Sequence, residues 1–194
     1  MFGRSFSPDA EIYKQTARMT VKMGADHEKL RAALALKERG YPSANFLLGT
    51  IYEFGGPHFP IDLEKATYYY RHSVHALRDS VSIVYLARAC MKRGHAHYND
   101  AHQWLLELEE IEVTASTHLA WAWYYETSPT PDLQLSRQRY VRAALRGRFW
   151  GFLGYSRVSR RMGERGRALG CDCLRVLVGP FLFLLLGART QYTF

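Results

Sequence analysis

Apolar residues recur at three- and four-residue intervals along most of the chain, which is the spacing of an amphipathic helix. After Asp62, for example, one apolar stripe is formed by Leu63, Ala66, Thr67, Tyr70, Val74 and Leu77. No stretch shows the strict alternation of apolar and polar residues that is typical of a half-buried strand. The pattern therefore predicts an all-α chain.

The helical pattern itself repeats along the sequence. Four segments begin with a large apolar residue followed by a small one, at Leu48-Gly49, Leu86-Ala87, Leu119-Ala120 and Leu153-Gly154. The steps between these leucines are 38, 33 and 34 residues by subtraction. Because this period fits two helices joined by short turns, we expect an α-solenoid of about four helix-turn-helix repeats. The small residue would let two helices approach closely.

Polar residues mark the predicted starts of the second helices. Side-chain oxygens at Asp62, Asn99-Asp100 and Asp132 are suited to accept hydrogen bonds from the free amides of a helix start. Thr130 followed by Pro131 predicts a start of its own, with a capping hydroxyl and a proline at the first helical position.

Two further signals bound the helices. Gly55-Gly56-Pro57 and Ser128-Pro129 predict turns, because these residues interrupt helical periodicity. At the N-terminus, Ser7-Pro8 with acidic residues in the next turn predicts an extra helix, which would cap the open end of the stack.

The stretch ANFLLGTIYEFGG followed by PIDLEKATYYYRHSV resembles the Sel-one-like repeat, a relative of the tetratricopeptide repeat with loops of variable length. The first copy carries the family's residues at Ala44, Leu48-Gly49, Tyr52, Gly55, Asp62 and Lys65-Ala66. Later copies keep the spacing but depart from the family's residues at some positions. Cys90 and Arg157 stand where an aromatic residue is expected, and Ser128 stands where a glycine is expected. The resemblance spans residues 26–170, between a capping helix in residues 1–25 and a hydrophobic segment in residues 171–194.

The resemblance implies a scaffold or adaptor rather than an enzyme, of a kind that in bacteria serves envelope, polysaccharide or secretion machinery. If the first helix of each repeat lines the concave face, a peptide or helix of a protein partner would bind to Phe46, Thr50, Glu53, Arg88, Met91, Trp121, Tyr124, Tyr125 and Tyr155. Large aromatic residues and arginine carry most of the binding energy at protein interfaces. The alternative is that several of these side chains pack between neighbouring repeats.

An uninterrupted apolar run extends from Val176 to Ala188. These 13 residues would rise only about 20 Å as a helix, which is short of a hydrocarbon core of about 30 Å. Its apolar side chains would nevertheless cover every direction around the axis: Leu177, Val178, Phe181, Leu182, Phe183, Leu184, Leu185 and Leu186. Three explanations stay open: insertion into a membrane, burial against a partner protein, and packing on the chain's own repeats.

Charge is distributed unevenly along the chain, whose net charge is +8. Residues 137–194 hold 12 of the 26 Lys and Arg but only 2 of the 18 Asp and Glu, and all 12 are arginine. A basic patch precedes the apolar run and favours the cytoplasmic side of a membrane, the inner membrane in a bacterium: Arg157, Arg160, Arg161, Arg165 and Arg167. The first residues lack the apolar run of a secretory signal, so the cytoplasm itself is the alternative location.

Nucleic-acid binding is the alternative function for this basic third of the chain. Its predicted stripe interleaves arginines and aromatic rings: Arg137, Arg139, Arg142, Arg146 and Arg148 with Tyr140, Phe149 and Trp150. The apolar C-terminus argues against this alternative, because a binder of soluble nucleic acid has no use for it.

Catalytic and metal-binding patterns are weak. His95, His97 and His102 with Cys90 come closest to a metal site, but their spacing alone does not supply the ligand geometry. Phosphate-binding, nucleophile-elbow and dinucleotide motifs are absent from the sequence. We therefore expect no enzymatic activity, no metal and no cofactor.

Three cysteines are too few and too unevenly spaced for a disulfide framework, so reduced thiols are expected. Cys171 and Cys173, at the start of the hydrophobic segment, are candidates for acylation, with free thiols as the alternative.

Overall fold

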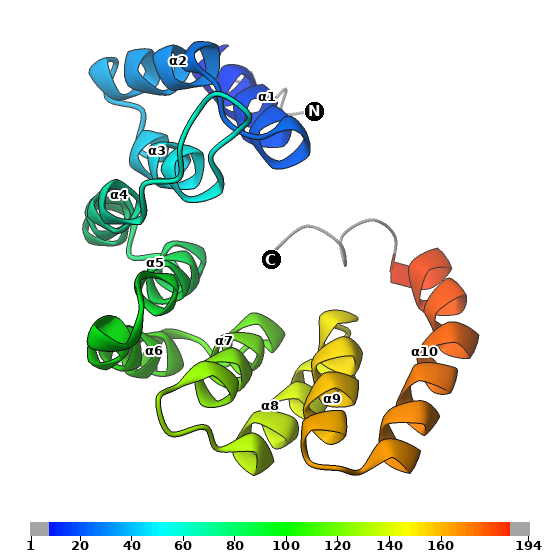
Figure 1. The fold of residues 1–194 in the computed structure, drawn as a ribbon. Helices are drawn as coiled ribbons and strands as arrows, with labels where there is room; N and C mark the ends of the chain where they lie inside the picture. Colours follow the sequence, from blue (N-terminus) through cyan, green and yellow to red (C-terminus); the bar gives the residue numbers. More distant parts are fainter. Residues whose placement is uncertain (1–7, 187–194) are drawn as a thin grey trace. The chain divides into compact units, whose positions relative to one another are not determined.

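The structure, a computed structural model, describes residues 8–186, apart from the side chains of Val21 and of residues 178–186. Within this range it contains ten α-helices, one 3₁₀ turn and no strand beyond a single bridge between Gly56 and Phe59 (Figure 1). The predicted all-α class is confirmed. Within each of its two units, described below, consecutive helices pack on one another in a repeat-like arrangement that is compatible with a helical solenoid.

The chain divides into two compact units, Met1–Gly94 and His95–Phe194. Unit 1 holds α1 (Pro8–Met23), α2 (His27–Glu38), α3 (Ala44–Phe54), α4 (Leu63–Leu77) and α5 (Ser80–Arg93). In this unit α1 packs on α2 and α3, α3 also packs on α2 and α4, and α4 packs on α5. The core between α2 and α3 contains fully buried Leu36, Leu47 and Ile51.

Unit 2 holds η1 (His95–His97), α6 (Tyr98–Ile111), α7 (Ala115–Thr127), α8 (Leu133–Leu145), α9 (Trp150–Arg161) and α10 (Arg165–Leu186). Each of the helices α6 to α9 packs on the next one along the chain. Leu119, Ala122, Tyr140, Ala143 and Val158 form the core between α7, α8 and α9.

Two of the predicted capping residues act as expected. The Asp62 carboxylate accepts a hydrogen bond from the Lys65 amide at 2.9 Å, and the Asp132 carboxylate accepts one from the Leu135 amide at 2.8 Å. Each satisfies an amide that has no partner within its own helix. At the N-terminus α1 begins at Pro8, where the sequence predicted a helix.

Two other predicted starts are wrong. The second helix of the second repeat, α6, begins at Tyr98 after His97, so Asn99-Asp100 lies inside its first turn. Thr130 does not cap α8. The N-cap residue is Asp132, and Pro131 lies before this cap rather than at the first helical position. A further helix, α2, was not predicted from the sequence. It starts after Asp26, whose carboxylate accepts a hydrogen bond from the Lys29 amide at 2.8 Å.

Close helix packing explains two of the small residues in the repeat. A Cβ added to Gly49 in α3 would lie 2.5 Å from the Tyr70 ring of α4, far inside van der Waals contact. At Gly154 in α9 an added Cβ would overlap the Tyr140 ring of α8. A glycine at each position therefore lets a tyrosine ring lie directly on the neighbouring backbone.

Candidate functional site

Glu53 is the centre of a buried polar cluster in unit 1. Its carboxylate accepts two hydrogen bonds from Arg88, from Nε at 2.7 Å and from Nη2 at 2.6 Å. The Tyr70 hydroxyl donates to the same carboxylate at 2.7 Å, and the Lys92 ammonium at 2.9 Å. The Glu53 cluster, as we call these four residues, joins α3, α4 and α5.

Unit 2 contains a second cluster of the same design around Glu126. Arg157 donates from Nε at 2.7 Å and from Nη2 at 2.6 Å, and the Tyr140 hydroxyl donates at 2.7 Å. Arg161, one turn after Arg157, lies 3.5 Å from the carboxylate, as Lys92 lies one turn after Arg88. The Glu126 cluster joins α7, α8 and α9, so the same interaction recurs two repeats later.

Both glutamates stay ionised in this setting. Burial alone would raise the pKa of Glu53, but the adjacent Arg88 guanidinium outweighs burial and holds that pKa below its ordinary value. Burial also opposes ionisation of Glu126, and hydrogen bonds from Arg157 and Tyr140 lower the pKa of Glu126. Burial and the neighbouring carboxylate raise the pKa of Tyr70, so its hydroxyl remains a donor. Both clusters are therefore held together by charge-assisted hydrogen bonds.

The predicted concave-face residues divide between the two units. Thr50, Glu53, Arg88 and Met91 are buried in unit 1, where Phe46 packs against the rings of Tyr70 and Tyr85. Trp121 in unit 2 is also buried, whereas Tyr124, Tyr125 and Tyr155 are half-buried. Burial of Glu53, Arg88 and Trp121 favours the alternative in which these side chains pack between helices. Partner binding by the half-buried residues stays a prediction.

Aromatic side chains of α6 and α7 form a connected set, the Trp121 cluster, made of Tyr98, His102, Trp121, Tyr124 and Tyr125. Trp121 stacks on Tyr125 with ring centroids 5.4 Å apart and meets Tyr124 edge-on at 5.6 Å. His102 packs edge-on against Trp121 at 5.4 Å. Burial, followed by the nearby Tyr125 and Tyr98 hydroxyls, raises the pKa of Tyr124. Ring contacts therefore restrict the positions of these half-buried tyrosines.

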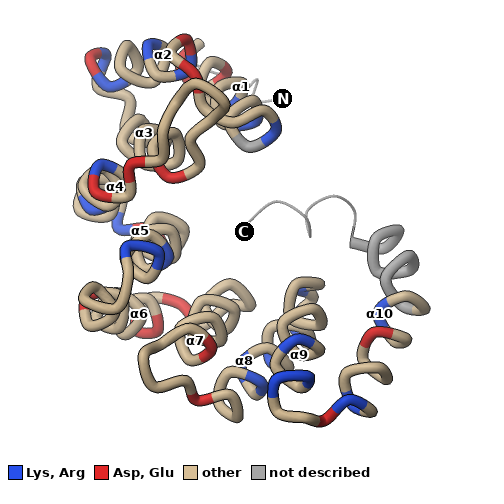
Figure 2. Tube along the Cα trace, viewed as in Figure 1, with Lys and Arg blue, Asp and Glu red and all other residues tan. Residues whose placement is uncertain are grey.

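Internal partners occupy most of the basic side chains in residues 137–167. Arg137 pairs with Glu164, Arg139 with Glu109 at 2.8 Å, and Arg148 bonds the Ser116 hydroxyl at 2.7 Å. In the predicted basic patch Arg157 and Arg161 reach Glu126, Arg160 pairs with Asp172, and Arg167 pairs with Glu164 at 2.9 Å. Figure 2 shows Lys and Arg on α8, on α9 and at the start of α10. Nucleic-acid binding through this region stays the alternative function.

His118 of α7 contacts Arg139 of α8 and Arg146, which follows the end of α8. The Arg146 guanidinium contacts its Nε2, and Arg139 Nη1 lies 3.4 Å from its Nδ1. Burial, then the charges of Arg146, Arg139 and Arg142, lower the pKa of His118 to about 4. The imidazole is therefore neutral at physiological pH.

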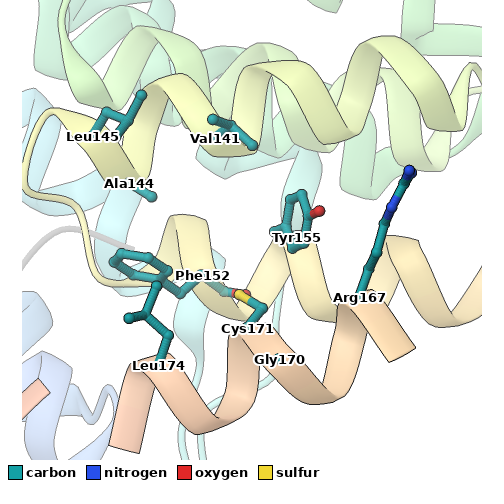
Figure 3. A pocket seen from close by; sticks show the side chains of 9 residues that line it. All are labelled: Val141, Ala144, Leu145, Phe152, Tyr155, Arg167, Gly170, Cys171 and Leu174. Carbon is teal, nitrogen blue, oxygen red and sulfur yellow. The ribbon is translucent and has the colours of Figure 1, made fainter. Parts of the chain in front are cut away.

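A pocket of ≈ 420 Å³ opens between α8, α9 and α10. We call it the α8–α10 pocket (Figure 3). It is lined by Val141, Ala144, Leu145, Phe152, Tyr155, Arg167, Gly170, Cys171 and Leu174. Two residues from separate predictions, Tyr155 of the concave face and Arg167 of the basic patch, meet here. Its size lies in the range of ligand pockets, about 300–1,000 Å³.

The first part of α10 packs on α9, where the Cys171 thiol donates to the Phe152 carbonyl at 3.4 Å. Leu177 is 69% exposed. The other predicted anchor side chains lie outside the described residues: Val178, Phe181, Leu182, Phe183, Leu184, Leu185 and Leu186. In the part of the chain that the structure describes, none of the helices has the length and apolar character needed to cross a membrane.

The histidines and cysteines do not assemble into a metal site. Among the described residues, no three His, Cys, Asp or Glu side chains come together in a way that could hold a metal ion. His102 instead belongs to the Trp121 cluster, and His95 packs edge-on against Tyr98 at 5.7 Å. The three cysteines are free thiols.

Comparisons with protein-family models, with curated proteins and with solved structures found no match for this chain.

Several functional candidates were not singled out from the sequence. Glu126 and His118 carried no signal in the local pattern. Tyr70 and Tyr140 did carry one, because each follows a capping aspartate by eight residues. Their shared role, donating a hydrogen bond to a buried glutamate, became evident only from the packing of three helices.

Proposed function

We propose that the chain is a non-enzymatic adaptor built from Sel-one-like repeats, which binds a protein partner through aromatic side chains and is held at a membrane by its C-terminal segment. The Trp121 cluster is the observation that carries the proposal. Tyr124 and Tyr125 remain half-buried on α7, backed by the buried Trp121 ring. Each presents a ring and a hydroxyl, the combination enriched at protein interfaces.

Preorganisation is the second support. Binding costs free energy when flexible side chains become ordered, and rings that already contact one another have less freedom to lose. The stacked and edge-on contacts of Trp121 with its two tyrosine neighbours supply this rigidity. The Arg139 guanidinium, which pairs with Glu109, has its carbon 5.5 Å from the Trp121 ring centroid and helps to hold that ring. A peptide or helix with apolar side chains suits this surface.

The test is affinity capture from the native host with the full-length chain, followed by quantitative mass spectrometry. We expect the double substitution Tyr124→Ala/Tyr125→Ala to lower recovery of the specific partner about tenfold or more, as loss of interface hot spots does. Trp121→Ala is a poor probe, because removing a ring that is 2% exposed would destabilise the core.

Tyr68→Ala serves as the matched control, since Tyr68 is a tyrosine of α4 that is 55% exposed. Unchanged recovery with a folded double variant would remove the Trp121 cluster from the proposal. For the membrane part, the full-length chain is compared with one ending at Leu177 after carbonate and high-salt washes. Equal release of both chains would rule out a C-terminal anchor.

A further inference from the structure

The α8–α10 pocket has two chemically different ends. Figure 3 shows the Tyr155 hydroxyl and the Arg167 guanidinium toward one end, and Leu145, Phe152 and Leu174 toward the other. Arg167 and Leu174 are seven residues apart on α10, which corresponds to about 10 Å along the helix. The pocket is therefore elongated, with a polar head region and an apolar trough.

The head region carries uncompensated positive charge. Arg167 and Arg137 share a single carboxylate, that of Glu164. None of the side chains that line the pocket is acidic. The Arg167 side chain is 61% exposed, and an exposed ion pair of this kind is weak, so its guanidinium is available to another anion.

Tyr155 adds a hydrogen-bond donor to the same region. Its ring is half-buried on α9, and its hydroxyl bonds no other residue in the described part of the chain. A hydroxyl and a guanidinium toward the same end of an apolar trough (Figure 3) are complementary to a carboxylate or a phosphate ester.

We propose that this pocket binds a long aliphatic chain that carries an anionic head group. The chain lies along Phe152, Leu145 and Leu174, and the head group lies beside Arg167 and Tyr155. A free fatty acid and a phospholipid present the same chemistry. A second copy of this chain is a poor occupant, because its own residues 137–194 are strongly basic. The inference does not depend on partner binding by the Trp121 cluster, which lies on α6 and α7.

The test is photo-labelling of the full-length chain with a dodecanoate that bears a diazirine on its alkyl chain. A phosphatidylglycerol with the same diazirine chain, incorporated in vesicles, forms the second arm and distinguishes lipid from free fatty acid as the source. We expect one or both probes to label peptides of α8, α9 or α10 saturably. A diazirine-bearing dodecanol, which lacks the anion, should label them at least fivefold less.

Gly170→Leu is the decisive variant. Gly170 lines the pocket, and a Cβ added there meets no atom within 4 Å, so a larger side chain can extend from this position and occupy space in the trough. Gly166→Leu is the matched control, because it is one turn earlier in α10, is equally unobstructed and does not line the pocket. We expect labelling to fall at least tenfold in Gly170→Leu and to stay unchanged in Gly166→Leu.

Leu145→Glu supplies an independent variant. Leu145 is 82% exposed, so the substitution places a carboxylate at the apolar end without disturbing the core. Labelling should fall there as well, and circular dichroism should show native helix content in all three variants. Equal labelling of Gly170→Leu and the native chain, or labelling confined to other helices, would overturn the proposal. The proposal would also fail if Gly170→Leu kept its labelling but no longer recovered a protein partner in the affinity capture. The pocket would then hold a side chain of that protein.

Discussion

Two glutamates, Glu53 and Glu126, each connect three consecutive helices through hydrogen bonds to an arginine and a tyrosine. A carboxylate removed from water is costly unless its oxygens find donors, and here the bidentate arginine supplies two of them. The Glu53 cluster and the Glu126 cluster differ in exposure: the Arg88 side chain is 6% exposed, and that of Arg157 is 54% exposed. Solvent can therefore replace Arg157 more easily than Arg88.

Arg88→Met should consequently destabilise unit 1 by about 3–5 kcal/mol, because it leaves a buried carboxylate without its main partner. Arg157→Met should cost about 1–2 kcal/mol, since water and Arg161 still reach Glu126. Urea unfolding followed by circular dichroism measures both losses. Adding Glu53→Met to Arg88→Met should recover part of the stability, because an apolar pair leaves no buried charge. Equal losses in the two arginine variants would contradict this account.

The sequence marked the tyrosine of each cluster by its spacing, but gave no sign of which residues pair with it. Tyr70 and Tyr140 stand eight residues after their capping aspartates, so local spacing marks them. Their glutamates lie 17 and 14 residues earlier in the chain, on the preceding helix. These separations differ and belong to no helical period, so the pairing depends on how three helices pack and could not be predicted from spacing. The same limit made Glu53 and Arg88 look like surface residues.

Helix starts were predicted well where one capping residue stood alone and poorly where several stood close together. Asp62 had no competitor, and it caps α4. Near α8, Thr130 and Asp132 both carry a suitable oxygen, and Asp132 is the one whose carboxylate reaches the Leu135 amide. Capping propensity is local and does not choose between neighbouring candidates. Packing of the following apolar stripe decides where the helix begins.

Replacing the capping aspartates by alanine is predicted to cost more stability than replacing Asp100. Asp62→Ala and Asp132→Ala should each destabilise the chain by about 0.5–2 kcal/mol, because each leaves a helix-start amide without an acceptor. Asp100→Ala should cost less than about 0.5 kcal/mol, because Asp100 lies inside the first turn of α6, where it contributes a favourable charge and an exposed contact with His97 at 3.6 Å. Thermal unfolding of the three variants measures the order. A loss for Asp100→Ala as large as the other two would show that it caps α6 after all.

At the scale of the whole molecule, repeat spacing predicted consecutive packed helices, and the described residues contain them. It did not predict the division between Gly94 and His95. The Leu-small anchors continue on both sides of this boundary, so spacing carries no sign of it. Tryptophan distribution makes the division useful: all four tryptophans, Trp104, Trp121, Trp123 and Trp150, belong to unit 2. Tryptophan fluorescence therefore reports on unit 2 alone.

His118 gives unit 2 a specific response to acid. Its pKa is lowered to about 4 by burial and by Arg146, Arg139 and Arg142, while Glu109, which pairs with Arg139, opposes the shift. Between pH 6.5 and about 4 the unfolded chain takes up a proton at His118 and the folded chain does not. The contribution of His118 to the free energy of unfolding is therefore at its full value above pH 6.5 and falls as the pH decreases toward 4. The lowered pKa values of Glu53 and Glu126 add acid sensitivity only at pH values below the ordinary glutamate range.

His118→Gln isolates this response, because glutamine is polar and does not titrate. We expect the tryptophan-monitored free energy of unfolding of the native chain to fall by about 1–2 kcal/mol between pH 7 and pH 5, less than the full pKa shift implies because solvent screens the arginines. In His118→Gln the decrease over the same range should be smaller by that amount. Urea titrations at pH 7, 6 and 5 measure both chains. Parallel pH profiles for the two would mean that the pKa of His118 is not lowered in the folded protein, because Glu109 offsets burial and the arginines.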